Sequence, residues 1–231
     1  MVKIIVYILS ILTKIKEKNT FKRLKKNGIK NQKIVLCFHG IFIDDCESVY
    51  SIYSDKFYEI IKKYTNLFIS IDDISSHNGI VLTFDDVKES VYSYAYPLLK
   101  KMKIPFTIFI TTNYIDKKGY LSSEQVKELS QDNLCTIGSH MCTHRKTREM
   151  SNKEITNEWL ESRQIIEKII GRQIFHAALP YGSVSSCTNK SIRLGLQCGY
   201  KTVSTTQSLT YHSGRVIPRF VYQNNKEFVL E

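Results

Sequence analysis

Two neighbouring acidic residues follow directly after an apolar segment of the chain. Residues 79–84 are typical of a buried strand, and Asp85 and Asp86 come next. Adjacent carboxylates repel each other unless one is neutralised or a cation lies nearby. Such a pair could serve a metal site, because one carboxylate can bind the ion while the other acts as a base. A turn or a helix N-cap explains the same pair without any chemistry.

Two histidines four residues apart supply a second kind of metal ligand. His140 and His144 follow another apolar segment, residues 134–138. On a helical turn this spacing places both side chains on one face. Two histidines and one carboxylate from another strand end form the arrangement common at catalytic zinc and iron sites. The histidines alone are a weak signal, since two unrelated histidines can have this spacing.

A short turn sequence ends a third apolar segment. Pro180, Tyr181 and Gly182 follow residues 174–179, which we predict to be a strand. Proline and glycine are frequent in turns, so a plain turn explains them. The functional interpretation is a tight loop whose backbone N–H points into a site.

The elements that must position these residues alternate along the chain. Apolar segments of four to eight residues alternate with longer segments of helical periodicity, which favours a parallel α/β fold, either an open sheet or a barrel. Polar residues gather just after predicted strands, which favours a barrel, because barrels collect chemistry at that rim. We predict strands at residues 33–38, 79–84, 104–111, 134–138, 174–179, 200–204 and 215–222, and helices at residues 55–64, 90–102, 122–130, 153–170 and 189–198.

Three of these segments together resemble the polysaccharide deacetylases, carbohydrate esterase family 4. Residues 83–86 (TFDD), 138–144 (GSHMCTH) and 179–182 (LPYG) resemble the family's first three motifs in order and spacing. Residues 37–40 and 96–107 are similar to flanking segments of the family. Residues 215–220 resemble the closing strand of a subgroup often seen with surface-polysaccharide synthesis. The resemblance covers about residues 33–230.

The resemblance implies a fold, a cofactor and a reaction. The fold would be a distorted (β/α) barrel, the cofactor a divalent metal, most often Zn²⁺ with Co²⁺ or Mn²⁺ as alternatives, and the reaction removal of acetyl groups from an N-acetylated sugar. The substrate would be an acetylated glycan or a lipid-linked sugar. Carried over by position, the catalytic residues are Asp85 as base and Tyr181 through its backbone N–H, the metal ligands are Asp86, His140 and His144, and the substrate contacts are Pro180, Tyr181 and Gly182.

The sequence departs from the family pattern at three places. Val87 stands where the family usually has glycine, and Ala178 stands where many members have an arginine that orients the catalytic aspartate. We therefore expect Asp85 to lack one source of orientation. The late histidine that serves as general acid has no clear counterpart, which leaves His39 and His212 as candidates.

Charge divides the 231-residue chain into two parts. The formal net charge is +11, of which residues 1–33 carry +9 and residues 34–231 only +2. Residues 1–32 form a basic arm with helical periodicity, and residues 33–231 form the predicted barrel domain. The pattern of the arm predicts either a basic amphipathic helix that binds an anionic membrane surface or a helix that packs against the domain. We expect no nucleic-acid partner, because the basic excess lies in the arm alone.

Location and reaction each leave alternatives open. The arm has no small-residue cleavage site, so we expect a cytoplasmic protein held at the inner membrane face, with an uncleaved export anchor as the alternative. The same site could instead cleave O-acetyl esters. The unplaced general acid also leaves open a degenerate carbohydrate-binding protein without turnover.

Overall fold

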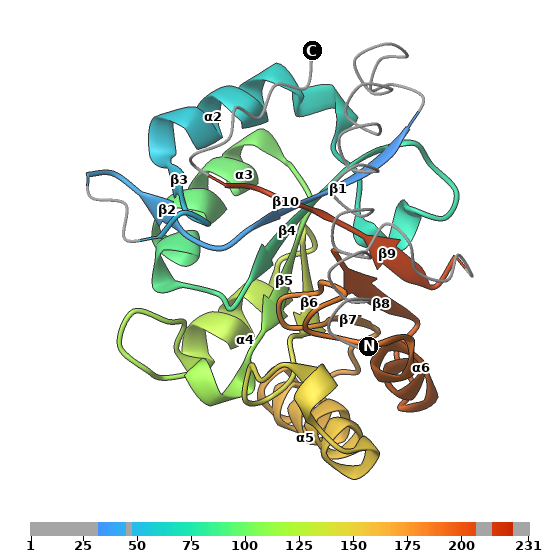
Figure 1. Cartoon of the computed structure of the whole chain (residues 1–231). Coiled ribbons are helices and arrows are strands. Elements are labelled where there is room, and N and C mark those ends of the chain that lie inside the picture. Colours follow the sequence, from blue (N-terminus) through green and yellow to red (C-terminus); the bar gives the residue numbers. More distant parts are fainter. Residues whose placement is uncertain (1–31, 45–47, 207–213, 224–231) are drawn as a thin grey trace.

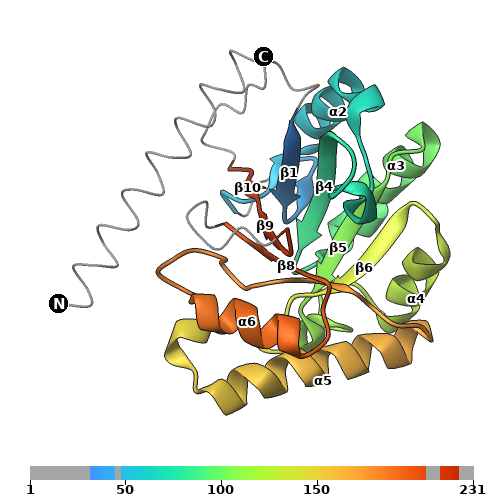
Figure 2. The same ribbon diagram turned by 90° about the vertical axis from the view of Figure 1, so that its right-hand side faces the viewer.

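A curved parallel sheet with helices on its outside forms the described part of the chain. The computed structural model describes residues 32–44, 48–206 and 214–223, so the predicted N-terminal arm lies outside it apart from its last residue. Within these residues the main sheet has the order β10-β1-β4-β5-β6-β7-β8-β9, and its neighbouring strands are all parallel. Helices α2 to α6 surround the strands (Figures 1 and 2).

The elements agree closely with those predicted, and several short ones add to them. The strands are β1 (Lys33–Phe38), β2 (Ile41–Phe42), β3 (Ile52–Tyr53), β4 (Gly79–Asp85), β5 (Phe106–Ile110), β6 (Cys135–Ser139), β7 (His176–Ala178), β8 (Thr202–Thr205), β9 (Val216–Pro218) and β10 (Phe220–Val221). The α-helices are α2 (Ser54–Lys63), α3 (Tyr96–Met102), α4 (Ser123–Gln131), α5 (Asn152–Ile170) and α6 (Asn189–Gln197). A π-helical turn (Val91–Ala95) precedes α3, and 3₁₀ turns cover Thr65–Leu67, Ile71–Asp73, Thr112–Tyr114 and Thr147–Glu149.

The last described strands close the sheet into a distorted barrel. β9 pairs with β8, and β10 pairs with β1, while Arg219 is the one residue between β9 and β10. A single segment therefore bridges the two edges of the sheet. The seam is short, since β9 has three residues and β10 has two. In Figure 1 this segment lies beside β1 near the centre of the molecule.

Local signals in the sequence set the helix ends. Ser122 caps α4 and Gln125 bonds back to it, so the two residues form a capping box. Ser151 and Glu154 form the same motif at the start of α5. Helix α5 ends at Gly171, whose φ of 71° is the left-handed conformation that glycine adopts without steric cost.

Strand alternation divides the core into an outer layer and an interior layer. Leu36, Phe38 and Phe84 belong to the large apolar cluster that includes the helices. The residues that alternate with these three along β1 and β4, such as Val35 and Val81, face the inside of the barrel, because side chains alternate along a strand. The small interior cluster contains Val35, Ile71, Val81, Phe109, Ala178 and Ile217.

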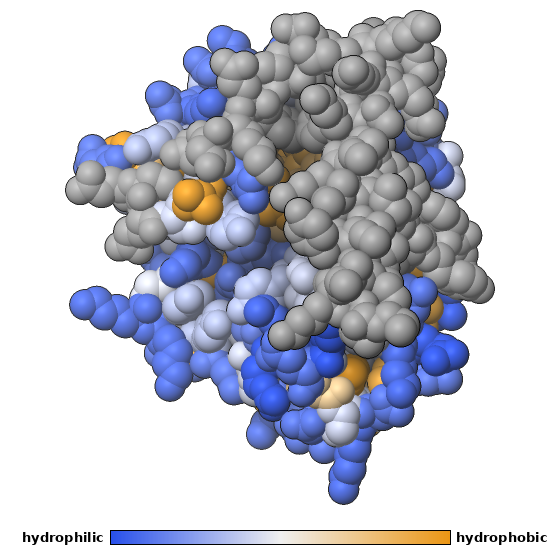
Figure 3. All heavy atoms as spheres, in the orientation of Figure 1, coloured by the Kyte–Doolittle hydropathy of each residue, from blue (hydrophilic) through white to orange (hydrophobic). Residues whose placement is uncertain are grey.

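The surface visible in Figure 3 is mostly hydrophilic over the described residues, with apolar atoms in small, separate areas. No helix of the described residues is long and apolar enough to cross a membrane.

Candidate metal and catalytic site

The two adjacent aspartates at the end of β4 share His140 as a neighbour but differ in their other partners. Alternation places Asp85 inside the barrel above Val81 and Thr83, where its side chain is buried and the residue is 3% exposed. The chain then turns sharply, since Asp86 has a φ of 60°. This turn separates the two carboxylates, so that Asp85 meets Arg219 while Asp86 meets His144. His140 lies near both, with Nε2 3.6 Å from Asp85 Oδ2 and 3.7 Å from Asp86 Oδ1.

The backbone conformation at Val87 explains why the family usually has glycine at this position. Its φ of 55° lies in the left-handed region, which costs an L-residue roughly 1–2 kcal/mol. The side chain is 1% exposed and belongs to the main core. Burying a valine contributes about 1.5–3 kcal/mol, which offsets the conformational cost. The departure from glycine is therefore compatible with the turn.

Asp86, His140 and His144 form a candidate metal site. Their ligand atoms lie within 4.8 Å of one another. Asp86 Oδ1 is 3.7 Å from Nε2 of His140 and 3.1 Å from Nε2 of His144. His140 Nδ1 lies 2.9 Å from the carbonyl oxygen of Ala178, to which it donates in the tautomer that leaves Nε2 free as a ligand. Two imidazoles and one carboxylate fit a catalytic zinc site, so the residues present suit the metal that the family uses.

The protonation of these side chains also suits metal binding. Burial lowers the pKa of His140 to about 4, so this imidazole is neutral near pH 7. Burial also opposes the charged form of His144, but its hydrogen bond to Asp86 outweighs this and raises the pKa. Burial would raise the pKa of Asp86, yet His144 and His140 lower it overall. Asp86 is therefore a charged ligand.

Arg219 orients Asp85, which corrects the expectation drawn from Ala178. Its guanidinium donates two hydrogen bonds to the carboxylate, from Nη1 to Oδ1 at 2.6 Å and from Nη2 to Oδ2 at 2.7 Å. Nη1 also lies 3.3 Å from Oγ1 of Thr83. The arginine missing from position 178 is thus replaced by one from the closing seam of the barrel.

Arg219 also sets the charge of Asp85. Burial raises the pKa of this carboxyl, but the attraction of Arg219 and then of His140 outweighs burial and holds the pKa well below its usual range. Asp85 is consequently ionised, and its position is fixed by the planar fork of the guanidinium.

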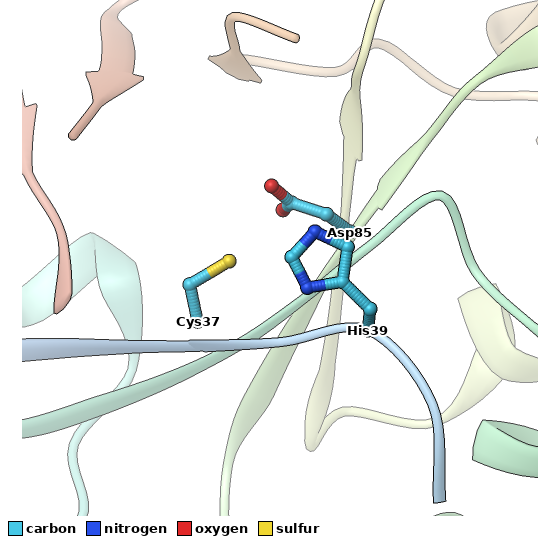
Figure 4. Close-up of side chains that lie close together, drawn as sticks. All are labelled: Cys37, His39 and Asp85. Atoms are coloured by element: carbon cyan, nitrogen blue, oxygen red, sulfur yellow. The ribbon is translucent and has the colours of Figure 1, made fainter. Parts of the chain in front are cut away.

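A second group of possible ligands consists of Cys37, His39 and Asp85 itself. Cys37 and His39, from β1 and its end, face the Asp85 carboxylate in one space (Figure 4), with ligand atoms within 4.8 Å. The positively charged guanidinium of Arg219 already lies against the Asp85 carboxylate here, which disfavours a second cation at this position. Burial raises the pKa of the Cys37 thiol well above its usual value, so the thiol stays neutral. This group is therefore a poorer metal site than the one at Asp86.

His39 and His212 were the two candidates for a general acid. Nδ1 of His39 is buried and has no hydrogen-bond partner among the described residues, and burial lowers the pKa of the ring. Its ring centroid is 5.4 Å from that of Tyr50. His212 lies outside the described residues, so its role stays a prediction.

The predicted Pro180–Gly182 turn lies against the candidate metal site. Gly182 N–H donates to the Pro180 carbonyl at 2.7 Å, and Tyr181 has a left-handed φ of 61°. This tight turn leaves Tyr181 53% exposed. Its ring meets the ring of His144 edge-on, with centroids 4.7 Å apart.

Aromatic rings continue from this turn along the edge of the site. Tyr114 lies 6.1 Å from His144 between ring centroids, and Tyr120 lies 4.6 Å from Tyr114. We call Tyr120, Tyr114, His144 and Tyr181 the aromatic strip. All four side chains are at least partly exposed.

Comparison with known proteins agrees with this geometry. The polysaccharide deacetylase family matches residues 73–203, which is more than half of the chain. The chain belongs to this family. A Staphylococcus aureus poly-β-1,6-N-acetyl-D-glucosamine N-deacetylase is 27% identical over an alignment of 156 residues, and the match covers 60% of this chain and 54% of that protein. The chain spans about half the length of the curated relatives it matches.

Solved structures share the fold of this polysaccharide deacetylase. IcaB from Ammonifex degensii superposes with a TM-score of 0.70 at 22% identity, covering 82% of this chain and 91% of that one. The Streptococcus pyogenes deacetylase PplD, solved with acetate, gives a TM-score of 0.73 at 20% identity and covers 84% and 93%. The predicted distorted (β/α) barrel is confirmed.

Arg219 is the residue of the candidate site that the sequence did not reveal. The sequence does place Pro218 and Arg219 in a segment that resembles a subgroup's closing strand. That signal identified the strand, but it could not show that the arginine would contact Asp85 at the end of β4.

Proposed function

We propose that this polysaccharide deacetylase is a zinc-dependent N-deacetylase that acts on a polymer of N-acetylglucosamine. The observation that carries the proposal is the division of work between the adjacent aspartates. Asp86 lies between His140 and His144 and can serve as a metal ligand, while Asp85, also near His140, is bound by Arg219 and acts as the base. A degenerate binding protein would have no need for both arrangements.

The residues then have separate roles in hydrolysis of the amide. Bound zinc would supply a Lewis acid for the acetyl carbonyl and for the attacking water. Asp85 accepts the proton of that water, and Arg219 holds the carboxylate in place as it does so. The backbone N–H of Tyr181 donates to the oxygen on which negative charge develops. Pro180 and Gly182 fix the turn that presents this N–H.

His39 is the proposed general acid for the departing amine. It lies beside Asp85, with ligand atoms within 4.8 Å of each other, and faces the same interior space. Its unpartnered Nδ1 offers a position for the proton that the amine must receive. Asp85 lies beside it and can pass on the proton that it took from water.

The aromatic strip supports a glycan substrate. Sugar rings have apolar faces that pack well against aromatic rings, and the strip offers several such rings in a row. Lys88 Nζ lies 4.5 Å from the ring centre of Tyr120, and Lys146 Nζ lies 6.0 Å from that of Tyr181. Positive charge at both ends favours neutral N-acetylated units over free glucosamine, which is cationic. The Staphylococcus aureus relative is named for a β-1,6-linked polymer of this sugar.

The test combines metal content with acetate release. The zinc-loaded protein is incubated with β-1,6-linked N-acetylglucosamine oligomers, with β-1,4-linked oligomers, and with an O-acetylated polysaccharide. We expect about one zinc per chain and acetate release from the β-1,6-linked oligomers. Asp86→Ala should lose both zinc and activity. Asp85→Asn should keep the zinc and lose activity about 10²–10⁴-fold, while Glu161→Gln on exposed helix surface should change neither.

Each other outcome rejects a stated part of the proposal. Absence of zinc from the wild-type protein after reloading would reject the metal site. Acetate release from the O-acetylated polysaccharide alone would reject the amide as the target bond. Zinc binding without acetate release from any of the three substrates would favour carbohydrate binding without turnover.

A further inference from the structure

Glu158 is a buried acidic residue that none of the roles above uses. It lies on α5 and is 8% exposed. Its Oε2 accepts hydrogen bonds from the backbone N–H of Cys142 at 2.8 Å and of Thr143 at 3.0 Å. Its Oε1 accepts a bond from the Thr143 hydroxyl at 2.6 Å. Among the described residues, Glu158 has no ion pair within 4.0 Å, and its carboxylate bonds instead to Cys142 and Thr143.

The segment that Glu158 holds lies between the two candidate histidine ligands. Cys142 and Thr143 are the last two of the three residues that separate His140 from His144. The Cys142 thiol also donates to the Glu158 carbonyl at 3.6 Å. Any movement of this short segment must therefore change the distance or the orientation between the two imidazoles.

The backbone of the segment needs external support. Met141 has a φ of 65° and His144 has a φ of 56°, both in the left-handed region. Each costs a non-glycine residue about 1–3 kcal/mol and persists where the surroundings determine the conformation. The Glu158 carboxylate binds the two N–H groups that lie between these positions. Its bonds can therefore stabilise the turn on which both histidines depend.

A second residue of α5 supports the other end of the segment. Ser162 lies one helical turn after Glu158, so the two side chains share a face of the helix. The hydroxyl oxygens of Ser162 and Ser139 are 2.6 Å apart, and Ser139 in turn accepts a bond from the Met141 N–H at 3.1 Å. Helix α5 thus contacts the segment at two points.

We infer that Glu158 is a positioning residue for the candidate metal site. Through Cys142 and Thr143 it sets the spacing of His140 and His144 so that both imidazoles face Asp86. The inference rests on the proposed function, because it assumes that these three residues bind the metal.

The test measures zinc affinity rather than turnover. Full-length variants are stripped of metal, and their zinc dissociation constants are measured by competition with a chromogenic chelator. Glu158→Ala removes all three bonds and should weaken zinc binding about tenfold or more. Glu158→Gln keeps one oxygen that can accept both N–H bonds, so it should remain within about threefold of the wild type. Glu161→Gln, one turn along the same helix and exposed, is the matched control and should not change the affinity.

A milder variant guards against failure of Glu158→Ala to fold. Thr143→Val removes only the 2.6 Å hydroxyl bond and should weaken zinc binding about threefold or more. Wild-type zinc affinity in a folded Glu158→Ala protein would overturn the inference, as would wild-type affinity in Thr143→Val where Glu158→Ala does not fold. Failure of the wild-type protein to bind zinc is a different result, which overturns the metal site itself together with this inference.

Discussion

Arg219 is the residue on which the separate roles of the two aspartates depend. Arg219→Lys keeps the positive charge but cannot bind both carboxylate oxygens through a planar fork. We expect deacetylation to fall about 10²-fold, because Asp85 is no longer held in one orientation. Acetate release under saturating substrate measures the effect. Arg215→Lys is the control, because Arg215 is exposed and its guanidinium donates to the backbone oxygens of Tyr200 and Lys201.

Removing the charge should affect the fold as well as the reaction. Arg219→Met leaves Asp85 buried without its partner, which typically costs about 3–5 kcal/mol in free energy of unfolding. Chemical denaturation of the metal-free protein measures this loss. Equal stabilities of wild type and Arg219→Met would contradict the proposed importance of the ion pair.

His144 should make metal binding depend on pH, whereas His140 should not do so near neutrality. In the metal-free protein Asp86 raises the pKa of His144 above the ordinary value of 6.5, although burial opposes this. Zinc binds only the unprotonated ring, so below the raised pKa each unit of falling pH should weaken binding about tenfold. His140, with a pKa of about 4, contributes only in stronger acid. Titration calorimetry in buffers of different ionisation enthalpy measures the released proton, and a constant affinity from pH 8 to pH 6 would contradict the prediction.

Single residues also mark the limit of what the sequence could predict. The ligand set Asp86, His140 and His144 follows from two short motifs, which come directly after β4 and β6 on either side of β5. Arg219 lies 134 residues from Asp85, and only the closure of the barrel brings them together. A single sequence carries no record of such a contact.

At the scale of elements, the approach of β5 and β6 depends on a glycine. A Cβ on Gly138 would lie 2.6 Å from Cδ1 of Phe109 and 2.8 Å from the His176 carbonyl oxygen. The guanidinium carbon of Arg219 in turn lies over the Phe109 ring, 5.2 Å from the centroid of that ring. Gly138→Ala should therefore lower the free energy of unfolding by about 1–3 kcal/mol and displace Phe109. Thermal unfolding measures the loss of stability. Acetate release measures how far the displacement of Phe109 affects the reaction.

A second substitution separates the two contacts of that glycine. Phe109→Leu removes the ring atoms that a Cβ would meet but leaves the His176 carbonyl in place. We expect the double variant to lose less free energy of unfolding than the two single variants lose in sum, because one clash is relieved. Strict additivity would show that the backbone contact alone accounts for the cost.

Elements with strong local signals were predicted well, and those without them were not. The capping boxes of α4 and α5 and the apolar run of β4 each specify their element locally. The β2–β3 pair is only two residues long on each side, which is too short for a periodic pattern. Residues 215–222 were predicted as one strand, but Arg219 interrupts it, because the segment changes its partner from β8 to β1 there.

At the scale of the whole molecule, the uneven charge of the chain predicts membrane attachment through the arm. Replacing Lys22, Arg23, Lys25 and Lys26 by glutamine should remove about 1 kcal/mol of attraction to an anionic surface for each charge. Sedimentation with vesicles that contain phosphatidylserine measures the loss. The matched control replaces four exposed lysines of the barrel and should bind like the wild type: Lys101, Lys117, Lys118 and Lys127. Equal sedimentation of both variants would reject a role for the arm in attachment.

Closure of the barrel at Arg219 also has a consequence for the order in which the molecule folds. The contact between Arg219 and Asp85 spans 134 residues, and contacts of such long range form slowly because a large loop must close first. During synthesis the candidate metal ligands leave the ribosome well before the arginine does. A nascent chain could therefore hold a metal while Asp85, the proposed base, still lacks its partner. Completion of the fold and onset of activity would be the same event, and metal binding alone would not report it.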